Sequence, residues 1–350
     1  MGDSIRRGKN KSGVIKVKQV LLAAVSLLCV SAAAIAQTND ACHSYIPAAI
    51  GGPMLAKDDE RVMLRWLANI NYEVDYHGQT FLFDAAYDRA PRNRPLGFTA
   101  LQVKKADAIF IGHAHFDHMS DAAIVAQDTK AKLVGDRIAV EKAINQGVPR
   151  EQTIVVKGGE SFRVGDVQVD VALAHHSEPG PGLLDALAAL YTLENGPLSE
   201  DERIRTAEIR ARGSSDAAIS TKGTMAYALT FPNGFKILHL SSAGPITDGD
   251  RALGQKLGSV DVAIIAYQAH ATFPPLVAAT FPLIQLFKPK LYLPGHHDAS
   301  YGAWVDVGLE PLFEKIRDEL PGTRFIAPLY RSPICVTTSG PKRGEAQFIP

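Results

Sequence analysis

Apolar residues fall in short runs along most of this chain, and polar turns separate the runs. The first runs predict an antiparallel meander of strands at 62–67, 70–76 and 80–84. Further strands are predicted at 108–111, 132–135, 153–156, 167–174, 224–231, 235–240, 260–266 and 291–293. Helical spacing predicts helices at 120–126, with Ser120 as the N-cap, and at 138–145, 251–257, 276–287 and 309–320. A meander followed by strand–helix alternation favours an α/β sandwich.

One stretch, residues 178–222, departs from this pattern. Its apolar residues from Leu183 to Tyr191 follow helical spacing. Ser199 and Glu202 form a capping-box pattern before a charged helix that runs through Arg212. Two interpretations are equally good: the helical insertion covers a pocket as a lid, or it is a peripheral hairpin or oligomer contact.

The first 36 residues have the features of an export signal. Lysines and arginines precede an apolar run from Val20 to Val30, which is short for a membrane span. Ala34-Ile35-Ala36 matches a cleavage pattern. We expect cleavage near Ala36 and a periplasmic or secreted protein that begins at Gln37 and keeps no stable membrane anchor. An uncleaved anchor is the alternative. The rest then comprises an extension at 37–60, one domain at 61–340 and a tail at 341–350.

The net charge of the chain narrows the classes of molecule that it can bind. Without residues 1–36, which carry six Lys or Arg and one Asp, the chain has 31 basic and 36 acidic residues, a formal net charge of −5. This balance argues against nucleic-acid binding, which usually needs a basic surface.

Cys29 lies in the signal, so Cys42 and Cys335 remain. In an oxidising compartment such a pair favours a disulfide, and two separate buried thiols are the alternative.

Three histidines and a carboxylate occupy six residues directly after the predicted strand 108–111. The sequence is His113-Ala114-His115-Phe116-Asp117-His118, preceded by Gly112. Loops at strand ends place functional groups on a rigid support. His113 and His115 can point the same way from an extended backbone because they are two residues apart. Imidazole and carboxylate ligands suit Zn²⁺ or another borderline transition metal, so the motif predicts a metal centre.

This hexapeptide resembles the metal motif of the metallo-β-lactamase-fold hydrolases, and the resemblance extends over most of the chain after about residue 60. Ala174-His175-His176-Ser177 is similar to the third-motif segment of that family. Pro294-Gly295-His296-His297-Asp298 is similar to its last metal motif. The similarity is greatest to the lactonase-like branch, which includes ascorbate-6-phosphate lactonase. The resemblance implies an αββα sandwich with the functional site at one edge of the two sheets.

The resemblance also implies two metal positions, with three protein ligands each. Three ligands leave an open place for water, as in catalytic zinc sites. We expect one or two Zn²⁺ per chain, with Mn or Fe as alternatives. Asp84 would support a ligand through a hydrogen bond; an ordinary turn carboxylate is the other interpretation. The predicted ligands are His113, His115 and His176 for one position, and Asp117, His118 and His296 for the other.

Two of these assignments involve neighbouring histidines. His176 matches the family ligand, whereas His175 should face away if the strand continues. His296 matches in the second pair, with His297 beside it. A swap within either pair is an open alternative.

The chain departs from the family at the position of the aspartate that bridges two metals. After the predicted strand 235–240 the sequence continues Ser241-Ser242-Ala243-Gly244, with Ser242 in place of that aspartate. A neutral hydroxyl is a poor ligand and adds no negative charge between two dications. We therefore expect a weaker second metal position or a mononuclear site. Asp298, two residues after His296, is a candidate compensating carboxylate.

Residues near the predicted site suggest how a reaction would proceed. Tyr267 and His270 follow the predicted strand 260–266 and either contact the substrate or belong to an ordinary loop. Asp117 would orient a water molecule or carry its proton if no second metal holds it firmly. His239, in the middle of a strand, is expected to be a hydrogen-bonded core residue.

The resemblance implies a metal-dependent hydrolase that uses a zinc-activated water on a small ester-like substrate, such as a lactone. The N-terminal segment adds the expectation that this hydrolase is exported. The apolar run at 183–191 hints at a hydrophobic acyl group, but a core helix would look the same. Phosphodiester hydrolysis is the alternative reaction. A non-catalytic metal- or ligand-binding protein that lost the bridging aspartate is a rival from another class. An iron-based redox enzyme is less favoured, because the chain has no Gly-rich dinucleotide motif.

Overall fold

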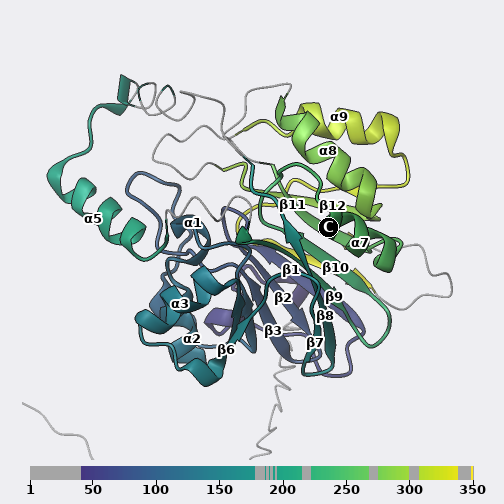
Figure 1. Ribbon diagram of the computed structural model, residues 1–350, viewed down its shortest axis with the longest axis horizontal. Helices are drawn as coiled ribbons and strands as arrows, with labels where there is room; N and C mark the ends of the chain where they lie inside the picture. The colour runs from purple at the N-terminus through teal and green to yellow at the C-terminus, as the bar shows by residue number, and fades with distance from the viewer. Residues whose placement is uncertain are drawn as a thin grey trace, which may run out of the picture. The chain divides into compact units, whose positions relative to one another are not determined.

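Two β-sheets form the centre of this computed structural model, which describes residues 41–177, 195–214, 222–267, 275–298, 307–337, 348–349 and isolated residues from 186 to 193. All of these residues belong to one compact unit, Asn39–Pro350. Helices cover the outer face of each sheet, and an apolar core lies between the sheets (Figure 1). The predicted αββα sandwich is confirmed. Among the described residues, no helix has the length and apolar character needed to cross a bilayer.

The first sheet has eight strands. Its first three strands in chain order form the predicted antiparallel meander, and the next three continue the sheet in parallel. A strand from much later in the chain pairs antiparallel with the first strand of the meander. The order is β15 (Phe348–Ile349), β14 (Pro333–Thr337), β1 (Arg61–Trp66), β2 (Tyr72–Tyr76), β3 (Gln79–Phe83), β4 (Ala108–Phe110), β5 (Lys132–Gly135) and β6 (Thr153–Val155).

The second sheet has seven strands. It is antiparallel from β7 to β10 and parallel from β10 to β13. Its order is β13 (Arg324–Phe325), β12 (Leu291–Gly295), β11 (Val262–Ala266), β10 (Lys236–Leu240), β9 (Thr224–Thr230), β8 (Val167–Ala174) and β7 (Ser161–Val164).

The helices complete the two outer layers. Beside the first sheet lie α2 (Ala122–Thr129) and α3 (Arg137–Asn145), and beside the second lie α7 (Asp248–Leu257), α8 (Pro275–Phe287) and α9 (Glu310–Glu319). The charged helix predicted in the insertion is α5 (Glu200–Ala211), and Ser199 caps it in the predicted capping box. The predicted helix at 183–191 falls outside the continuous described ranges. Short 3-10 turns are Ala41–His43, Ala48–Ile50, Ala100–Gln102 and Arg150–Gln152.

Two details of the sequence-based prediction were wrong. The helix predicted at 120–126 corresponds to α2, which begins at Ala122, and Ser120 is not its N-cap. Ser120 is instead the C-cap of a short preceding helix that was not predicted, α1 (Phe116–Met119). Asp121 directly precedes α2, but its carboxylate does not cap that helix. The carboxylate instead accepts the backbone N–H groups of Tyr87 and Asp88. The prediction also missed the strands β7, β13, β14 and β15. β7 is short and half exposed, and β13 and β15 have two residues each, so their apolar signal is weak.

A buried charged cluster fixes residues 41–49 to the first sheet. We call Arg65, Glu73 and Asp75 the Arg65 cluster. Arg65 Nη1 lies 2.8 Å from Glu73 Oε1 and 3.2 Å from Asp75 Oδ2, and all three side chains are fully buried. The remaining atoms also have partners: Arg65 Nη2 donates to Ala41 O, and Glu73 accepts from the Ala49 N–H. This cluster anchors the segment before β1.

A disulfide strengthens the same region. Cys42 and Cys335 are bonded, with Cα atoms 5.8 Å apart, and this outcome confirms the disulfide interpretation over two separate thiols. Cys335 lies in β14, opposite Met63 of β1. The bond therefore joins the 3-10 turn Ala41–His43 to the sheet close to the Arg65 cluster.

Candidate metal centre

Strand ends from both sheets bring the predicted metal ligands to one edge of the sandwich. The loop after β4 leads into α1 and carries the histidine-rich hexapeptide. His176 follows β8 in the second sheet, and His296 follows β12 directly. Parallel neighbours place their carboxyl ends at the same edge, which is why segments far apart in sequence meet there.

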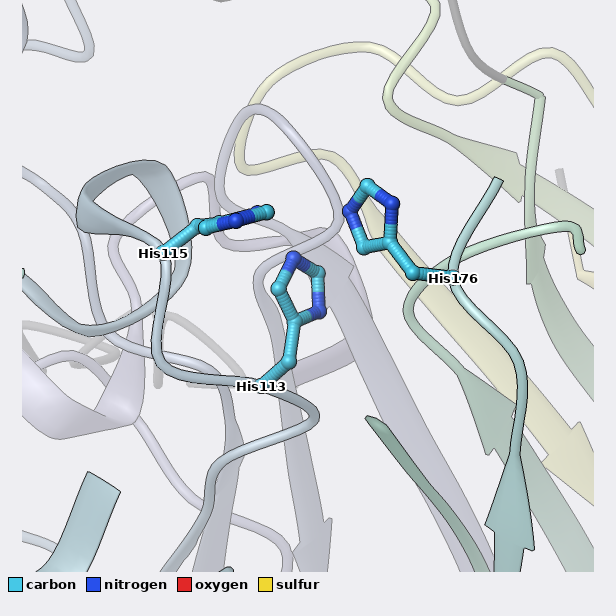
Figure 2. Close-up of side chains that lie close together, drawn as sticks. All are labelled: His113, His115 and His176. Atoms are coloured by element: carbon cyan, nitrogen blue, oxygen red, sulfur yellow. The ribbon is translucent and has the colours of Figure 1, made fainter. Parts of the chain in front are cut away.

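The first group contains three histidines. One ligand atom each from His113, His115 and His176 lies within 4.8 Å of the others. Figure 2 shows the rings converging on a common point from three sides, His113 and His115 from one loop and His176 from the opposite strand. The rings meet nearly at right angles, for example at 84° between His115 and His176. Such an arrangement lets three ring nitrogens face one ion.

The second group contains Asp117, His118 and His296, whose ligand atoms also lie within 4.8 Å of one another. Asp117 Oδ2 is 3.3 Å from His296 Nε2 and 3.7 Å from His118 Nε2. All three residues are buried. We call these six residues the ligand cluster.

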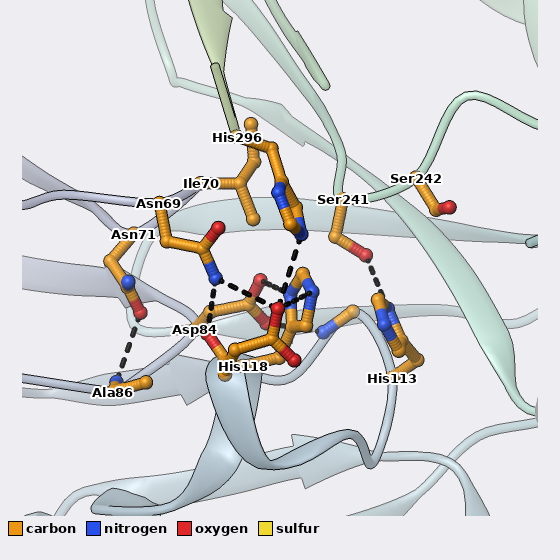
Figure 3. Close-up of polar contacts among 12 residues, drawn as sticks. Asn69, Ile70, Asn71, Asp84, Ala86, His113, His118, Ser241, Ser242 and His296 are labelled. Carbon is orange, nitrogen blue, oxygen red and sulfur yellow. Dashed lines mark hydrogen bonds and ion pairs between the residues drawn. The ribbon is translucent and has the colours of Figure 1, made fainter. Parts of the chain in front are cut away.

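The structure distinguishes the two histidines of each neighbouring pair. His176 joins the first group, whereas His175 Nδ1 lies 2.7 Å from the backbone carbonyl of His176. His296 joins the second group, whereas His297 stacks on Trp66 with ring centroids 4.5 Å apart. Figures 2 and 3 show the rings of His176 and His296 directed towards their groups.

Asp84 supports the second group. Its Oδ2 lies 2.8 Å from His118 Nδ1, and its Oδ1 accepts the Gly112 N–H at 2.7 Å. This carboxylate–histidine contact holds the His118 ring with Nε2 towards Asp117 and His296. Asp84 has a left-handed backbone, with φ of 57°, which turns its carboxylate back towards the hexapeptide loop. Asp84 thus has the hydrogen-bonding position expected from the sequence.

Ser241 and Ser242, which follow β10, contact two different segments of the first group. Ser241 Oγ lies 3.0 Å from His113 Nδ1, a contact that the sequence did not suggest. Ser242 Oγ accepts the Ser177 N–H at 2.9 Å and so contacts the segment that carries His176. Gly112 is needed here, because a Cβ at this residue would lie 2.1 Å from Ser241 Oγ.

Asp298 has several partners of its own. Its two oxygens accept the Asn69 N–H at 3.1 and 3.0 Å, and Oδ2 is 2.7 Å from Arg89 Nη1. The Tyr330 hydroxyl also donates to it. These contacts occupy both carboxylate oxygens of Asp298. Its compensating role stays a prediction.

Asn69 is the supporting residue that sequence analysis missed. Its side-chain amide donates to the backbone carbonyl of Asp117, and its backbone carbonyl accepts the backbone N–H of His296 at 2.7 Å. Through Asp298 it is also linked to the Arg89 guanidinium. Ala68 and Asn69 both have positive φ, and the sequence signal was an asparagine in a tight turn between strands.

The remaining predicted residues lie in different surroundings. Tyr267 packs in the apolar cluster between the second sheet and its helices, because alternation along β11 puts it on the same face as Ile265. Its catalytic role stays a prediction. His270 lies outside the described residues. His239 is a core residue, stacked on Phe83 with Nε2 3.2 Å from the Ile70 carbonyl.

Burial sets the protonation of the ligand cluster. It lowers the pKa of His118 and of His176 to about 3, so both rings are neutral at neutral pH. Burial would raise the pKa of Asp117, but the imidazoles of His118 and His296 outweigh it and hold that pKa well below its usual range. Neutral imidazoles and an ionised carboxylate are the forms that bind metal.

The residues present fit a metal ion. Within the described residues, His113 Nε2, His115 Nδ1 and Asp117 Oδ1 are buried without a hydrogen-bond partner. Buried polar atoms normally have partners, since leaving one unsatisfied costs about 1–3 kcal/mol. Nitrogen-rich sets with one carboxylate match zinc and similar ions.

Comparisons with known sequences agree with this centre. A family model described as a beta-lactamase superfamily domain matches residues 79–188. A UPF0173 metal-dependent hydrolase of Chloroflexus aurantiacus is 28% identical over 221 residues, which cover 63% of this chain and 75% of that protein. A protein of the same name from a Roseiflexus species is 24% identical and covers 67% of this chain and 82% of its own.

Solved structures show the same fold. Igni18, a metallo hydrolase of Ignicoccus hospitalis, aligns with a TM-score of 0.55 and 15% identity over 79% of this chain and 98% of its own. An isothiocyanate hydrolase from Delia radicum gut bacteria aligns with a TM-score of 0.51 and 14% identity over 77% of this chain and 97% of its own. The predicted resemblance to metallo-β-lactamase-fold proteins is confirmed.

Proposed function

We propose that this chain, which has the metallo-β-lactamase fold, is a metal-dependent hydrolase. The observation that carries the proposal is the convergence of two buried ligand groups whose inward nitrogen and oxygen atoms include several without a protein partner. Relatives named metal-dependent hydrolases support it. We further propose zinc as the metal and a small ester-like molecule such as a lactone as the substrate, following the resemblance of the motifs to the lactonase-like branch.

The chain's own residues prepare the site for water attack. A bound zinc ion would supply a Lewis acid and a hydroxide at neutral pH. Asp84 fixes the orientation of His118, and Ser241 fixes that of His113, so both rings are pre-positioned. Asp117 has one oxygen near His296 and His118 and a second oxygen, Oδ1, without a protein partner. That second oxygen is placed to accept a proton from attacking water.

We propose unequal metal positions. The three-histidine group is complete without residue 242, whereas the second group lacks the bridging carboxylate, since Ser242 is directed to Ser177 and Asp298 to Asn69 and Arg89. Less negative charge between two dications weakens the second. The first group should therefore fill first.

We propose that the protein works outside the cytoplasm on a small molecule and without nucleic acid. The Cys42–Cys335 disulfide supports this location, because disulfides persist in oxidising compartments. The basic and apolar sequence before residue 37 supports export. Fractionation of cells that express the full chain tests this proposal: recovery in the cytoplasm with the two cysteines reduced would contradict it.

The test of the hydrolase proposal combines metal content with activity. Elemental mass spectrometry should find at least one zinc per chain, and the loaded protein should hydrolyse members of a panel of lactones and simple esters. His115→Ala should lose about one metal and reduce hydrolysis by at least about 1,000-fold, the scale of losing an essential group. His43→Ala, an exposed histidine of the first 3-10 turn, is the matched control and should change neither value.

Full metal binding without hydrolysis of any ester, lactone or phosphodiester would favour the non-catalytic alternative. Hydrolysis of phosphodiesters alone would keep the enzyme but change its substrate class. Unchanged activity in His115→Ala would mean that the ligand cluster is not the active site.

A further inference from the structure

The charged helix of the insertion, α5, ends against the loop that carries the metal ligands. α5 contacts α1, the short helix that begins within the hexapeptide (Figure 1). Ser214 follows the end of α5, and its N–H donates to the backbone carbonyl of Ala114 at 2.7 Å. Ile209, in the last turn of α5, is buried. We call residues 209–214 the insertion end.

The insertion end also contacts Phe116. A Cβ on Gly213 would lie 2.3 Å from the Phe116 Cα and N, so the two backbones are too close for a side chain at Gly213. The Arg210 guanidinium lies over the Phe116 ring, with its Cζ 5.5 Å from the ring centroid. Glycine at residue 213 therefore permits a direct contact between the insertion and the start of α1.

Metal ligands and contacts with the insertion alternate along the hexapeptide. His113, His115 and Asp117 supply ligand atoms to the two groups. Ala114 and Phe116, which stand between them in the sequence, contact the insertion end. Neighbouring side chains of an extended segment point to opposite sides, so a partner behind the loop can hold the ligands in front of it. Because Phe116 separates a ligand of the first group from a ligand of the second, its position affects both groups.

An ion pair of Arg212 fixes the insertion end to the first sheet and its helices. Arg212 Nη1 lies 2.6 Å from Asp121 Oδ1, and the Asp121 side chain is fully buried. The other oxygen of Asp121 accepts the N–H groups of Tyr87 and Asp88, in the segment after β3. The Arg212 carbonyl accepts a hydrogen bond of 2.9 Å from Gln146 Nε2, at the end of α3. Arg212 thus joins the insertion to two separate parts of the molecule.

The ion pairs further along α5 are more exposed. Glu202 lies 2.7 Å from Arg92, and both side chains reach solvent. Arg205 lies 3.2 Å from Asp88, and its side chain is 45% exposed. Exposed ion pairs contribute little, because water competes for both charges, whereas a buried carboxylate that loses its cation is costly. The position of the insertion end therefore depends most on Arg212.

We propose that the insertion end is a positioning element of the metal centre and that Arg212 is its anchor. This inference rests on the proposed metal-dependent function. The contacts of Ser214 and Gly213 fix the backbone on both sides of His115, so the ligands of both groups keep their places. Disturbing the insertion end should therefore weaken both metal positions together, whereas Asp84 supports only the second.

Cobalt binding tests this inference. The visible absorption of Co²⁺ depends on its ligands and their geometry, and competition with a chelator gives its affinity. In the full chain, Gly213→Ala should weaken each cobalt position about 10-fold and alter the absorption, because the new Cβ displaces the Phe116 backbone. Gly322→Ala is the matched control and should change neither value, since its Cβ would meet nothing within 4 Å.

Variants of Arg212 separate positioning from stability. Arg212→Gln should also weaken cobalt binding at both positions, and Arg212→Lys, which keeps the charge, should recover part of the affinity. Arg203→Ala is the control, because Arg203 is exposed and pairs with Glu200 inside α5. A lower melting temperature in Arg212→Gln with unchanged cobalt affinity would mean that Arg212 only stabilises the fold, and would overturn its assignment. If Arg212→Gln does not fold, Gly213→Ala and Arg212→Lys decide.

The outcomes distinguish this inference from the hydrolase proposal. Unchanged cobalt affinity and absorption in Gly213→Ala overturn the inference and leave the hydrolase proposal intact. A loss at the second position alone also overturns it, because Phe116 lies between ligands of both groups. Weaker cobalt binding in Gly213→Ala, in a protein whose wild type hydrolyses no substrate, supports the inference while the proposed reaction fails.

Discussion

The Arg65 cluster and the ligand cluster are both buried groups of titratable side chains, yet they differ in how completely they are satisfied. In the Arg65 cluster, the side-chain nitrogen and oxygen atoms have protein partners, from Glu73 and Asp75 to the backbone of residues 41–49. In the ligand cluster, His113, His115 and Asp117 each keep a buried atom without one. A buried cluster whose polar atoms all have protein partners has a structural role. A buried cluster that leaves several converging polar atoms without protein partners is organised to bind a ligand.

The largest expected effect comes from breaking the satisfied cluster. Arg65→Ala should lower the free energy of unfolding by about 3–5 kcal/mol, because the Glu73 carboxylate would stay buried without its cation. Urea denaturation of the metal-free protein measures this change. His115→Gln is the counterpart in the ligand cluster and should cost no more than about 1 kcal/mol, since His115 Nδ1 has no protein partner to lose. Similar losses in both variants would remove the distinction between the clusters.

A smaller effect on stability is expected at Gly112, which lies close to Ser241, the residue that contacts His113. Gly112→Ala should destabilise the protein by about 1–3 kcal/mol through overpacking, since the new Cβ would meet Ser241 Oγ at 2.1 Å. Combining it with Ser241→Gly should recover part of the loss, because Ser241 Oγ and Cβ, which would lie 2.1 and 2.4 Å from the new Cβ, are both removed. A double-mutant cycle measures this coupling. Strictly additive effects would show that Gly112 is needed for a different reason.

Removing one supporting charge should act on metal binding more than on folding. Asp84→Asn should weaken the second metal position about 10- to 100-fold, because the amide supports His118 less well than a carboxylate. Burial raises the pKa of Asp84 to about 7, so the neutral substitute should cost little stability in the metal-free protein. Competition with a chelator gives the two affinities, and Asp128→Asn, on an exposed residue of α2, is the control. An equal loss at the three-histidine position would contradict this assignment.

The smallest expected effect on stability concerns the protonation of Asp75 in the Arg65 cluster. Burial, together with Glu73, raises the pKa of Asp75 well above its usual value. A raised carboxyl pKa gives stability that is complete below the unfolded pKa of about 3.9 and is lost as pH rises. Asp75→Asn should therefore cost less than about 1 kcal/mol near pH 4 and become more favourable relative to wild type towards pH 8. Urea midpoints across this range test the trend; an opposite slope would mean that Asp75 is held ionised.

Periodicity predicted most of the scaffold. The meander and the parallel strands were recognisable because each repeats an apolar pattern over several residues. The charged helix α5 was recognisable by its capping box. The strands β7, β13 and β15 and the four-residue helix α1 were missed because such short elements carry little periodic signal. The resemblance of short motifs gave the six ligands that the structure gathers into two groups.

The supporting residues could not be predicted in the same way. Asn69 and Asp298 are 229 residues apart in the chain, and no local pattern relates them. Ser241 looked like the plain neighbour of Ser242 until the fold placed it against His113. Residues that act through tertiary contacts need the three-dimensional arrangement before their role can be inferred.

The pairing of β1 with β14 has a consequence for the order of folding. Arg61–Trp66 has β2 on one side, but its other side is completed only by Pro333–Thr337. During synthesis, the edge of β1 therefore stays open until more than 260 further residues have left the ribosome. Closing so long a loop is slow. A chaperone that shields this exposed strand edge would act on β1 during that interval, before β14 pairs with it.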